Sequence, residues 1–464
     1  SSFAQNSFNH NKGQYLDGKL GMDFYPTEKS TFGFGYKLSL SPSERNVDNT
    51  ALVTDPSGNL LQKAVADNLS DRTFTNNLIN AYYSRSLDSL GSKISVDADY
   101  VTYASTNDQL FKNFQYNAND QLIYEDQING KIPSEINIYA LKSDYSKVLR
   151  NKSKIDGGLK TVLTKTDNEA IYSTTVAGVT TPDYNLSNRF LYDEWINSAY
   201  VNYSMEVGRV GLQMGLRAEV TRLEGNQLGN PVTPDTSFTR NYTSLFPTLY
   251  VSTKLDSAGV HGMNFSYGRR INRPYFQDLN PFISPLDKFT FYTGNPNLLP
   301  TYSHNLSLSY SFKNMINTSL SYSLITDGIQ ETLEIQDSLY FSRPGNIASS
   351  EFLSLSVDGT FNLAKWYTLN MYTEAALVHF ESDLYTEQLD SKGINLFFSA
   401  TNSFNLGKGW RIDVSGRVLN DQVASQLLIK GWGVLDFGVQ KKVLKGRGSV
   451  KLSASDLFLS LIHI

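Results

Sequence analysis

Cysteine is absent from the 464 residues of this chain, and histidine is scarce, with five residues in all. The lack of cysteine excludes a disulfide scaffold, a thiol nucleophile and every cysteine-containing zinc site. Neither sign of charge dominates, because the chain has 41 Lys and Arg residues and 45 Asp and Glu residues, which gives a net charge of −4. We therefore expect no metal ion, no cofactor and no nucleic-acid partner.

Long apolar runs and catalytic motifs are missing too. No stretch approaches the roughly 18 to 20 apolar residues that a membrane-spanning helix needs. The chain has no nucleophile elbow, no HExxH and no phosphate-binding loop. Acidic pairs such as Asp108 and Asp120 lie in polar stretches where nothing fixes their separation. We predict that the protein is not an enzyme.

Alternation of apolar and polar residues with a period of two dominates the sequence. In 209–221, Val, Leu, Met and Ala occupy one face, and Arg, Gly, Gln, Glu and Thr occupy the other. The stretches 305–312, 316–324 and 410–418 repeat the pattern. A strand has this pattern when one face is buried or in lipid and the other is wet. The 28 Tyr and 26 Phe also favour strands, so we expect almost no long helix.

Short and long connections alternate along the chain, as they do in an up-and-down barrel, where short turns share one rim and long loops the other. Nine short turns, each joining two strands, predict about 18 strands. Tyr and Trp residues near the strand ends fit interfacial girdles or ordinary sheet aromatics. The turn signals lie near 25–30, 88–92, 151–154, 208–210, 256–259, 313–315, 364–365, 407–409 and 445–448, and the longer polar stretches are 41–71, 106–134, 167–193, 224–239, 275–300 and 327–350.

The most distinctive stretch is 266–300, which begins as a strand and becomes a loop dense in proline, asparagine and glycine. Its prolines cannot donate to a strand ladder, so they end the strand and stiffen the loop. The prolines are Pro274, Pro281, Pro285, Pro296 and Pro300.

This stretch resembles the TonB-dependent receptors, a family of outer-membrane β-barrels. In that family a strand ending in Tyr-x-Arg-x-Ile-x-Arg-Pro leads to Leu-Asn-Pro-Phe and then to Gly-Asn-Pro-x-Leu-x-Pro. The segments 194–203 and 215–219 resemble two upstream strands of the same family. The matching residues here are Tyr267, Arg269, Arg270, Ile271, Asn272, Arg273 and Pro274, then Leu279, Asn280, Pro281 and Phe282, then Gly294, Asn295, Pro296, Leu298 and Pro300.

The three arginines of this motif have two interpretations. Arg269, Arg270 and Arg273 either pair with Asp278 or Asp287 and hold the long loop, or face the lumen and contact an anionic substrate or a plug. Alternation places Arg269 and Arg273 on one face of the strand and Arg270 on the other.

The resemblance implies a transmembrane antiparallel barrel of 22 strands, with short periplasmic turns and long extracellular loops, in the bacterial outer membrane. It also implies an N-terminal plug and a segment that reaches the TonB complex, neither of which is visible here. We predict a barrel domain over 1–458 that is incomplete at both ends, with an atypical and non-native tail at 459–464. The resemblance implies outer-membrane lipid as a partner, import of a siderophore, oligosaccharide or peptide, and allows a surface lipoprotein.

Two other functions fit the same pattern. The first is a passive porin or another barrel without a plug. The second is a soluble secreted carbohydrate-active β protein, in which the apolar strand faces pack against a second sheet.

Overall fold

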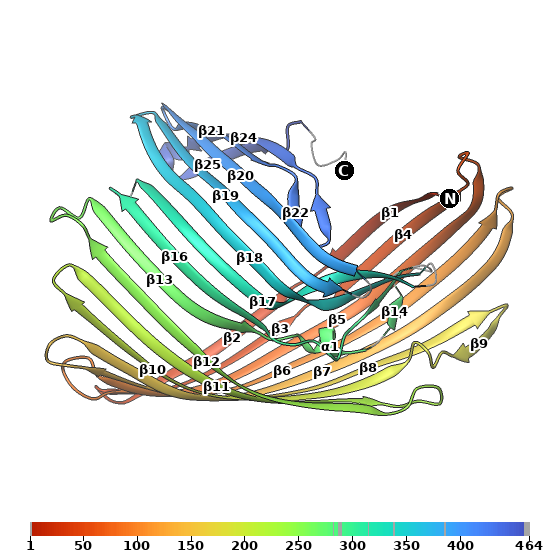
Figure 1. The fold of residues 1–464 in the computed structure, drawn as a ribbon, viewed down its shortest axis with the longest axis horizontal. Helices are drawn as coiled ribbons and strands as arrows, with labels where there is room; N and C mark the ends of the chain where they lie inside the picture. Colours follow the sequence, from red (N-terminus) through yellow and green to blue (C-terminus); the bar gives the residue numbers. More distant parts are fainter. Residues whose placement is uncertain are drawn as a thin grey trace.

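Strands make up nearly all of the protein, as the sequence predicts (Figure 1). The computed structural model describes residues 2–281, 283–285, 290–313, 315–336, 339–384 and 387–458, so the tail at 459–464 lies outside the described residues. Helical structure within these ranges is limited to α1 (Phe276–Leu279) and one 3-10 turn, η1 (Leu444–Gly446). In the same ranges, no helix is long and apolar enough to cross a membrane.

One large antiparallel sheet runs through the molecule, and each long strand pairs with the next long strand of the chain. Within the described ranges, its 23 segments form 18 passes, as the turn count predicts. Two passes are each split into two segments, and β9, β14 and β15 are short segments within connections. The split passes are β1 (Ser2–Gly13) with β2 (Leu16–Thr27), and β3 (Ser30–Leu40) with β4 (Ser43–Thr54).

The remaining passes run in chain order around the sheet. They are β5 (Leu60–Ser86), β6 (Lys93–Asn117), β7 (Leu122–Val148), β8 (Lys154–Val176), β10 (Asn188–Val207), β11 (Val210–Leu228), β12 (Thr236–Lys254), β13 (His261–Asn272), β16 (Thr301–Phe312), β17 (Ile316–Gln336), β18 (Leu339–Ala364), β19 (Tyr367–Leu384), β20 (Glu387–Gly407), β21 (Trp410–Leu419), β24 (Trp432–Val443) and β25 (Gly448–Ala454). The short segments are β9 (Val179–Pro182), β14 (Ile283–Pro285) and β15 (Thr290–Thr293), and β22 (Gln422–Ala424) with β23 (Leu427–Ile429) forms a separate hairpin.

Nine short connections lie where the sequence predicts them, and we call their end of the sheet the short-turn rim. Several use the left-handed backbone that glycine favours, as at Gly208 and Gly259. At the turn between β5 and β6, Asp88 accepts hydrogen bonds from the backbone N–H groups of Leu90 and Ser92, at 3.0 Å each, and from Lys147 Nζ at 2.9 Å. Hydrogen bonds from Ser92 and Lys147 hold the pKa of the Asp88 carboxyl well below its usual range.

At the opposite rim the structure differs from the sequence prediction. The polar stretches 41–71 and 106–134, which the pattern assigns to loops, are mostly strand, and the connections are only 55–59 and 118–121. Strands β5 and β7 are each 27 residues long. A strand needs only about 9 to 11 residues to cross a bilayer. The barrel wall therefore continues well beyond the apolar belt as polar hairpins.

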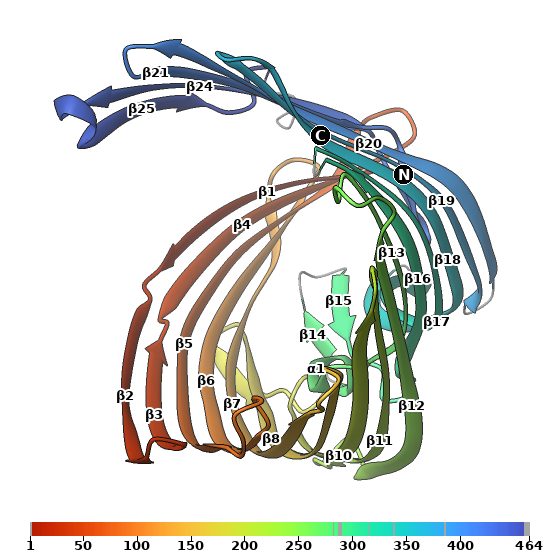
Figure 2. The same ribbon diagram turned by 90° about the vertical axis from the view of Figure 1, so that its left-hand side faces the viewer.

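The two faces of the sheet differ as the alternation predicts. In β11, Val220 is 52% exposed, whereas its neighbours Glu219 and Thr221 are 9% and 0% exposed. Figure 2 shows the sheet curling around a lumen. Glu219 and Thr221 share the inner face of β11 with Leu223, which belongs to the same buried cluster as Leu279 inside the curl. The outer face carries exposed apolar side chains such as Leu216 and Met214, and no second sheet of the described residues packs on them.

The curled sheet has two free edges. Among the described residues, β2 pairs with β3 alone, and β25 pairs with β24 alone. In Figure 2, β21, β24 and β25 swing away from the edge formed by β1 and β2.

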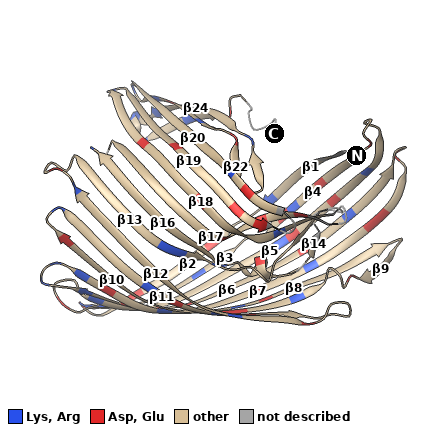
Figure 3. Cartoon of the chain, in the orientation of Figure 1, with Lys and Arg blue, Asp and Glu red and all other residues tan. Residues whose placement is uncertain are grey.

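The lumen wall carries few charges over β16, which has no Lys, Arg, Asp or Glu (Figure 3).

Leu216 tests the assignment of the outer face to lipid. Leu216→Arg is expected to lower the free energy of unfolding in lipid vesicles by about 2–4 kcal/mol, because it places a charge in the apolar belt. Urea titration of the refolded protein measures the change. The control is Gln213→Arg on the lumen face of the same strand, where a small change is expected. Equal costs for both variants contradict the assignment.

Candidate functional site

The part of the motif that follows β13 folds into the lumen. We call residues 274–300 the inward segment. It contains α1, β14 and β15, and Figure 2 shows these three elements inside the curl of the sheet. β15 pairs in parallel with the start of β18, with Phe291 opposite Phe341. The segment thus begins at β13 and reaches β18, with its described residues inside the lumen.

The two Asn-Pro motifs of the inward segment pack against each other. The backbone N–H of Gly294 donates to the carbonyl oxygen of Asn280 at 3.0 Å, and the backbone N–H of Asn295 donates to the carbonyl oxygen of Asp278 at 2.5 Å. A side chain at position 294 would meet the Asn280 carbonyl oxygen at 2.1 Å, so only glycine fits there. The structure therefore brings Leu279, Asn280 and Pro281 together with Gly294, Asn295 and Pro296, whereas Phe282 lies outside the described residues.

An apolar cluster fixes the inward segment to the wall of β8, β10 and β11. Leu279 and Leu298 are 1% and 0% exposed, and they form a buried cluster with wall residues. Each fully buried leucine of this kind stabilises a fold by roughly 1.5–3 kcal/mol. The buried wall residues of the cluster are Ala170, Tyr172, Phe190, Tyr192 and Leu223.

Two polar side chains hold the end of the inward segment from both sides. Arg240 of β12 donates hydrogen bonds to the backbone carbonyl oxygens of Pro296 and Leu298. The amide of Asn346 in β18 accepts from Leu299 N at 2.8 Å and donates to Leu299 O at 3.0 Å. Because these side chains satisfy buried backbone groups, the turn-rich end of the segment needs no strand partner.

Arg273 connects the start of the inward segment to three strands. Its Nη2 lies 2.6 Å from Glu219 Oε2 and 2.9 Å from Thr221 Oγ1 of β11, and its Nε donates to Tyr242 Oη of β12 at 3.1 Å. Glu194 of β10 lies 3.9 Å away. The Arg273 side chain is only 18% exposed. This ion pair is therefore shielded from water and sensitive to loss of either partner.

The electrostatics of this cluster favour the charged arginine. Burial by itself lowers the pKa of Arg273, but the hydrogen bond that Arg273 donates to Glu219 and the nearby Tyr242 outweigh burial and raise the pKa above its usual value. Glu219 also pairs with Arg217, at 2.8 Å. One carboxylate thus pairs with two guanidinium groups. The Oε1 of the second carboxylate, Glu194, has no hydrogen-bond partner among the described residues.

The partners of the motif arginines differ from the expected ones. Arg269 donates to the carbonyl oxygen of Leu245 at 2.9 Å and lies over the ring of Tyr302, whereas Arg270 is exposed and has no ion pair among the described residues. The expected pairing with Asp278 is wrong, because that carboxylate accepts from the Tyr275 backbone N–H and caps α1. Asp287 lies outside the described residues.

The other motif residues belong to the wall. Tyr267 lies in β13, and its hydroxyl is 3.0 Å from His304 Nδ1 of β16. Ile271 and Asn272 pair with Tyr302 and Thr301 at the end of the same ladder. Pro274 is buried directly after the strand, where it ends the ladder.

Sequence reasoning missed several residues that hold the inward segment. Glu194 and Glu219 lie in the two flanking stretches that carry the family resemblance, so a search for acidic partners of Arg273 there had a signal to follow. Arg240 and Asn346 gave no signal, because nothing in the sequence around either residue marks it as a partner of the inward segment.

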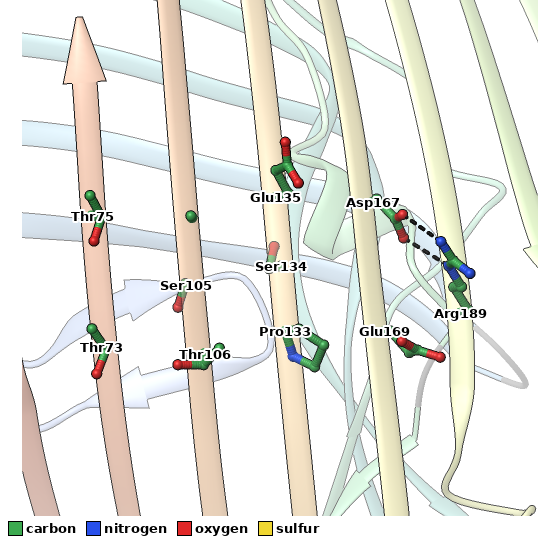
Figure 4. Close-up of a pocket in the computed structure, with 11 residues that line it drawn as sticks. Thr73, Thr75, Ser105, Thr106, Pro133, Ser134, Glu135, Asp167, Glu169 and Arg189 are labelled. Atoms are coloured by element: carbon green, nitrogen blue, oxygen red, sulfur yellow. Dashed lines mark hydrogen bonds and ion pairs between the residues drawn. The ribbon is translucent and has the colours of Figure 1, made fainter.

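A depression of about 400 Å³ lies on the other face of the wall. Arg189 forms a two-point contact with Asp167 at its edge, with distances of 3.0 and 2.7 Å (Figure 4). Successive side chains of a strand point to opposite faces, and Ala170 of β8 faces the lumen. The side chains of Asp167 and Glu169 therefore point outward. The depression is therefore separate from the lumen site.

Comparison with known proteins identifies the family. A model described as the outer membrane protein beta-barrel family matches residues 85–461, which is most of the chain. The chain belongs to this family. The predicted outer-membrane location is confirmed by this membership, and the alternative of a soluble secreted protein is wrong. No curated protein matches the chain.

Solved structures support the fold of this outer membrane protein. The ferric-catecholate import receptor Fiu from E. coli K12, in its closed form, is 7% identical with a TM-score of 0.58, over 99% of this chain and 77% of that one. The siderophore receptor PiuA from Acinetobacter baumannii is 10% identical with a TM-score of 0.54, over 98% and 77%. The ferric yersiniabactin uptake receptor FyuA from Yersinia pestis is 10% identical with a TM-score of 0.50, over 97% and 75%. These likenesses show the predicted barrel fold.

The Arg273 cluster can be tested by stability. Arg273→Leu is expected to lower the free energy of unfolding by about 3–5 kcal/mol, because it leaves Glu219 and Glu194 buried with less compensation. Urea titration in lipid vesicles measures the loss. Arg270→Leu, next to it in the motif but without an ion pair, is the control, with a change within about 0.5 kcal/mol. The cluster has no holding role if both variants unfold alike.

Proposed function

We propose that this outer membrane barrel is the transport barrel of a TonB-dependent receptor, which imports a scarce solute such as a siderophore, an oligosaccharide or a peptide. The motif behind the family resemblance and the barrel fold shared with import receptors support the proposal. The motif residues from Tyr267 to Pro300 then serve to place the inward segment in the lumen.

The attachment of the inward segment to both sides of the lumen carries this proposal. Leu279 and Leu298 fix it to the wall of β8, β10 and β11, and Asn346 fixes it to β18. A passive pore requires a lumen that stays open to diffusion. A receptor instead benefits from an obstructed lumen, because the obstruction retains a captured solute until energy is supplied.

The polar inner wall is compatible with the proposal that a plug lies inside the barrel. Serine hydroxyls bond one another across β16 and β17, with Ser309 and Ser319 at 2.8 Å and Ser307 and Ser321 at 3.1 Å. A wall whose hydroxyl groups are already paired offers a neutral surface against which a folded domain can move. We infer that a plug preceding these strands lies against it and couples the barrel to the TonB complex, and that further strands join the two free edges.

TonB dependence tests the proposal directly. The full-length protein is expressed in cells with and without functional TonB, and accumulation of labelled ferric siderophores, oligosaccharides and peptides is measured. At least one solute is expected to accumulate only when TonB is functional, because the obstructed lumen blocks diffusion and the proposal assigns the energy for release to the TonB complex.

The alternative functions give different results in the same experiment. Accumulation that is equal in both strains and proportional to external concentration identifies a passive porin and contradicts the proposal. A plugless scaffold barrel gives no accumulation of any solute in either strain.

A further inference from the structure

A second hollow lies on the lumen side of the wall, between α1 and strands β5–β8. It has a volume of about 480 Å³. Arg72 and Phe74 line it from β5, and Tyr103 lines it from β6, while Phe276 and Gln277 close it from α1. Arg72 and Phe74 alternate with Thr73 and Thr75, which line the outer depression of Figure 4, so the two hollows lie on opposite faces. We call this hollow the lumen pocket.

Arg72 is the charged group of the lumen pocket, and it has no carboxylate partner among the described residues. Its Nε donates to Ser105 Oγ at 3.3 Å, a long hydrogen bond, and its other guanidinium donors have no hydrogen bond to the residues that the structure describes. Arg217 and Arg273, by contrast, both pair with Glu219. A guanidinium presents a fork of donors that matches a carboxylate or a similar anion.

Flat apolar surface lies beside this free guanidinium. The Arg72 guanidinium is 5.6 Å from the centroid of the Phe74 ring, and the Phe74 and Tyr103 rings are 5.9 Å apart at 30°. Phe276 adds a third ring from α1. Aromatic side chains stack favourably on planar rings, and the arginine fixes the charged end of such a ligand.

We propose that the lumen pocket binds an anionic group attached to a planar unsaturated ring, and that the imported solute carries such a group. The second part rests on the proposed transport function, whereas the binding chemistry does not. Because Phe276 and Gln277 belong to the inward segment, the bound ring contacts both the fixed wall and that segment.

Equilibrium dialysis with 2-naphthoate tests the pocket in the full-length protein reconstituted in lipid nanodiscs, with empty nanodiscs as the blank. Saturable binding of 2-naphthoate is expected, with weaker binding of the uncharged 2-naphthamide. Arg72→Gln is expected to weaken 2-naphthoate binding about tenfold, the size of one lost charge-assisted hydrogen bond, and to leave 2-naphthamide unchanged.

Two further variants keep the test decisive. Gln277→Glu changes an exposed residue of α1 and adds a carboxylate beside Arg72, so 2-naphthoate binding is expected to weaken without loss of fold. Arg85→Gln lies on the same strand but on the outer face, and it is the matched control with unchanged binding.

Three results overturn the proposal. They are no saturable 2-naphthoate binding to the natural protein, equal binding by the natural protein and Arg72→Gln, and equal loss in Arg72→Gln and Arg85→Gln. Dialysis needs no TonB, so its outcome is separate from the uptake experiment. Binding without TonB-dependent uptake leaves the pocket and removes the transport function, and the reverse result removes the pocket alone.

Discussion

Pairing of every backbone amide with a neighbouring strand is the constraint on which this structure depends. Lipid offers no hydrogen-bond partner, so a membrane wall made of strands must satisfy its peptide groups within the sheet. The ladder in turn fixes the side chains to alternate faces. Apolar residues such as Val220 then lie outside and polar residues such as Glu219 lie inside. The polar lumen is therefore a consequence of the wall.

The inward segment meets the same constraint by other means. Its prolines prevent it from joining the sheet, so its buried carbonyl oxygens need side-chain donors. Arg240 and Asn346 supply them, and Leu279 and Leu298 bury against the wall. An apolar cluster thus forms inside the barrel where the segment meets the wall of β8, β10 and β11. The same placement forms the lumen pocket, because α1 stands opposite Arg72 and Phe74.

The sequence predicts those features that depend on neighbouring residues. The nine turns follow from local signals such as Gly208, and the strand faces follow from alternation. The polar hairpins beyond the belt escape prediction, because both of their faces meet water and no hydrophobic period marks them as strand. The stretch 215–219 marks Glu219 as a residue of interest, but its pairing with Arg273 is not local, because Glu219 lies 54 positions earlier and only the register of the sheet brings it near.

Accessibility along β11 tests the central claim most directly. The chain has no cysteine, so single-cysteine variants at each position from 210 to 221 can carry a spin label without background. In lipid vesicles, even positions are expected to be accessible to oxygen dissolved in lipid, and odd positions to a water-soluble nickel complex, with a strict period of two. Loss of that period, or water accessibility on both faces, contradicts a membrane-spanning wall around a polar lumen.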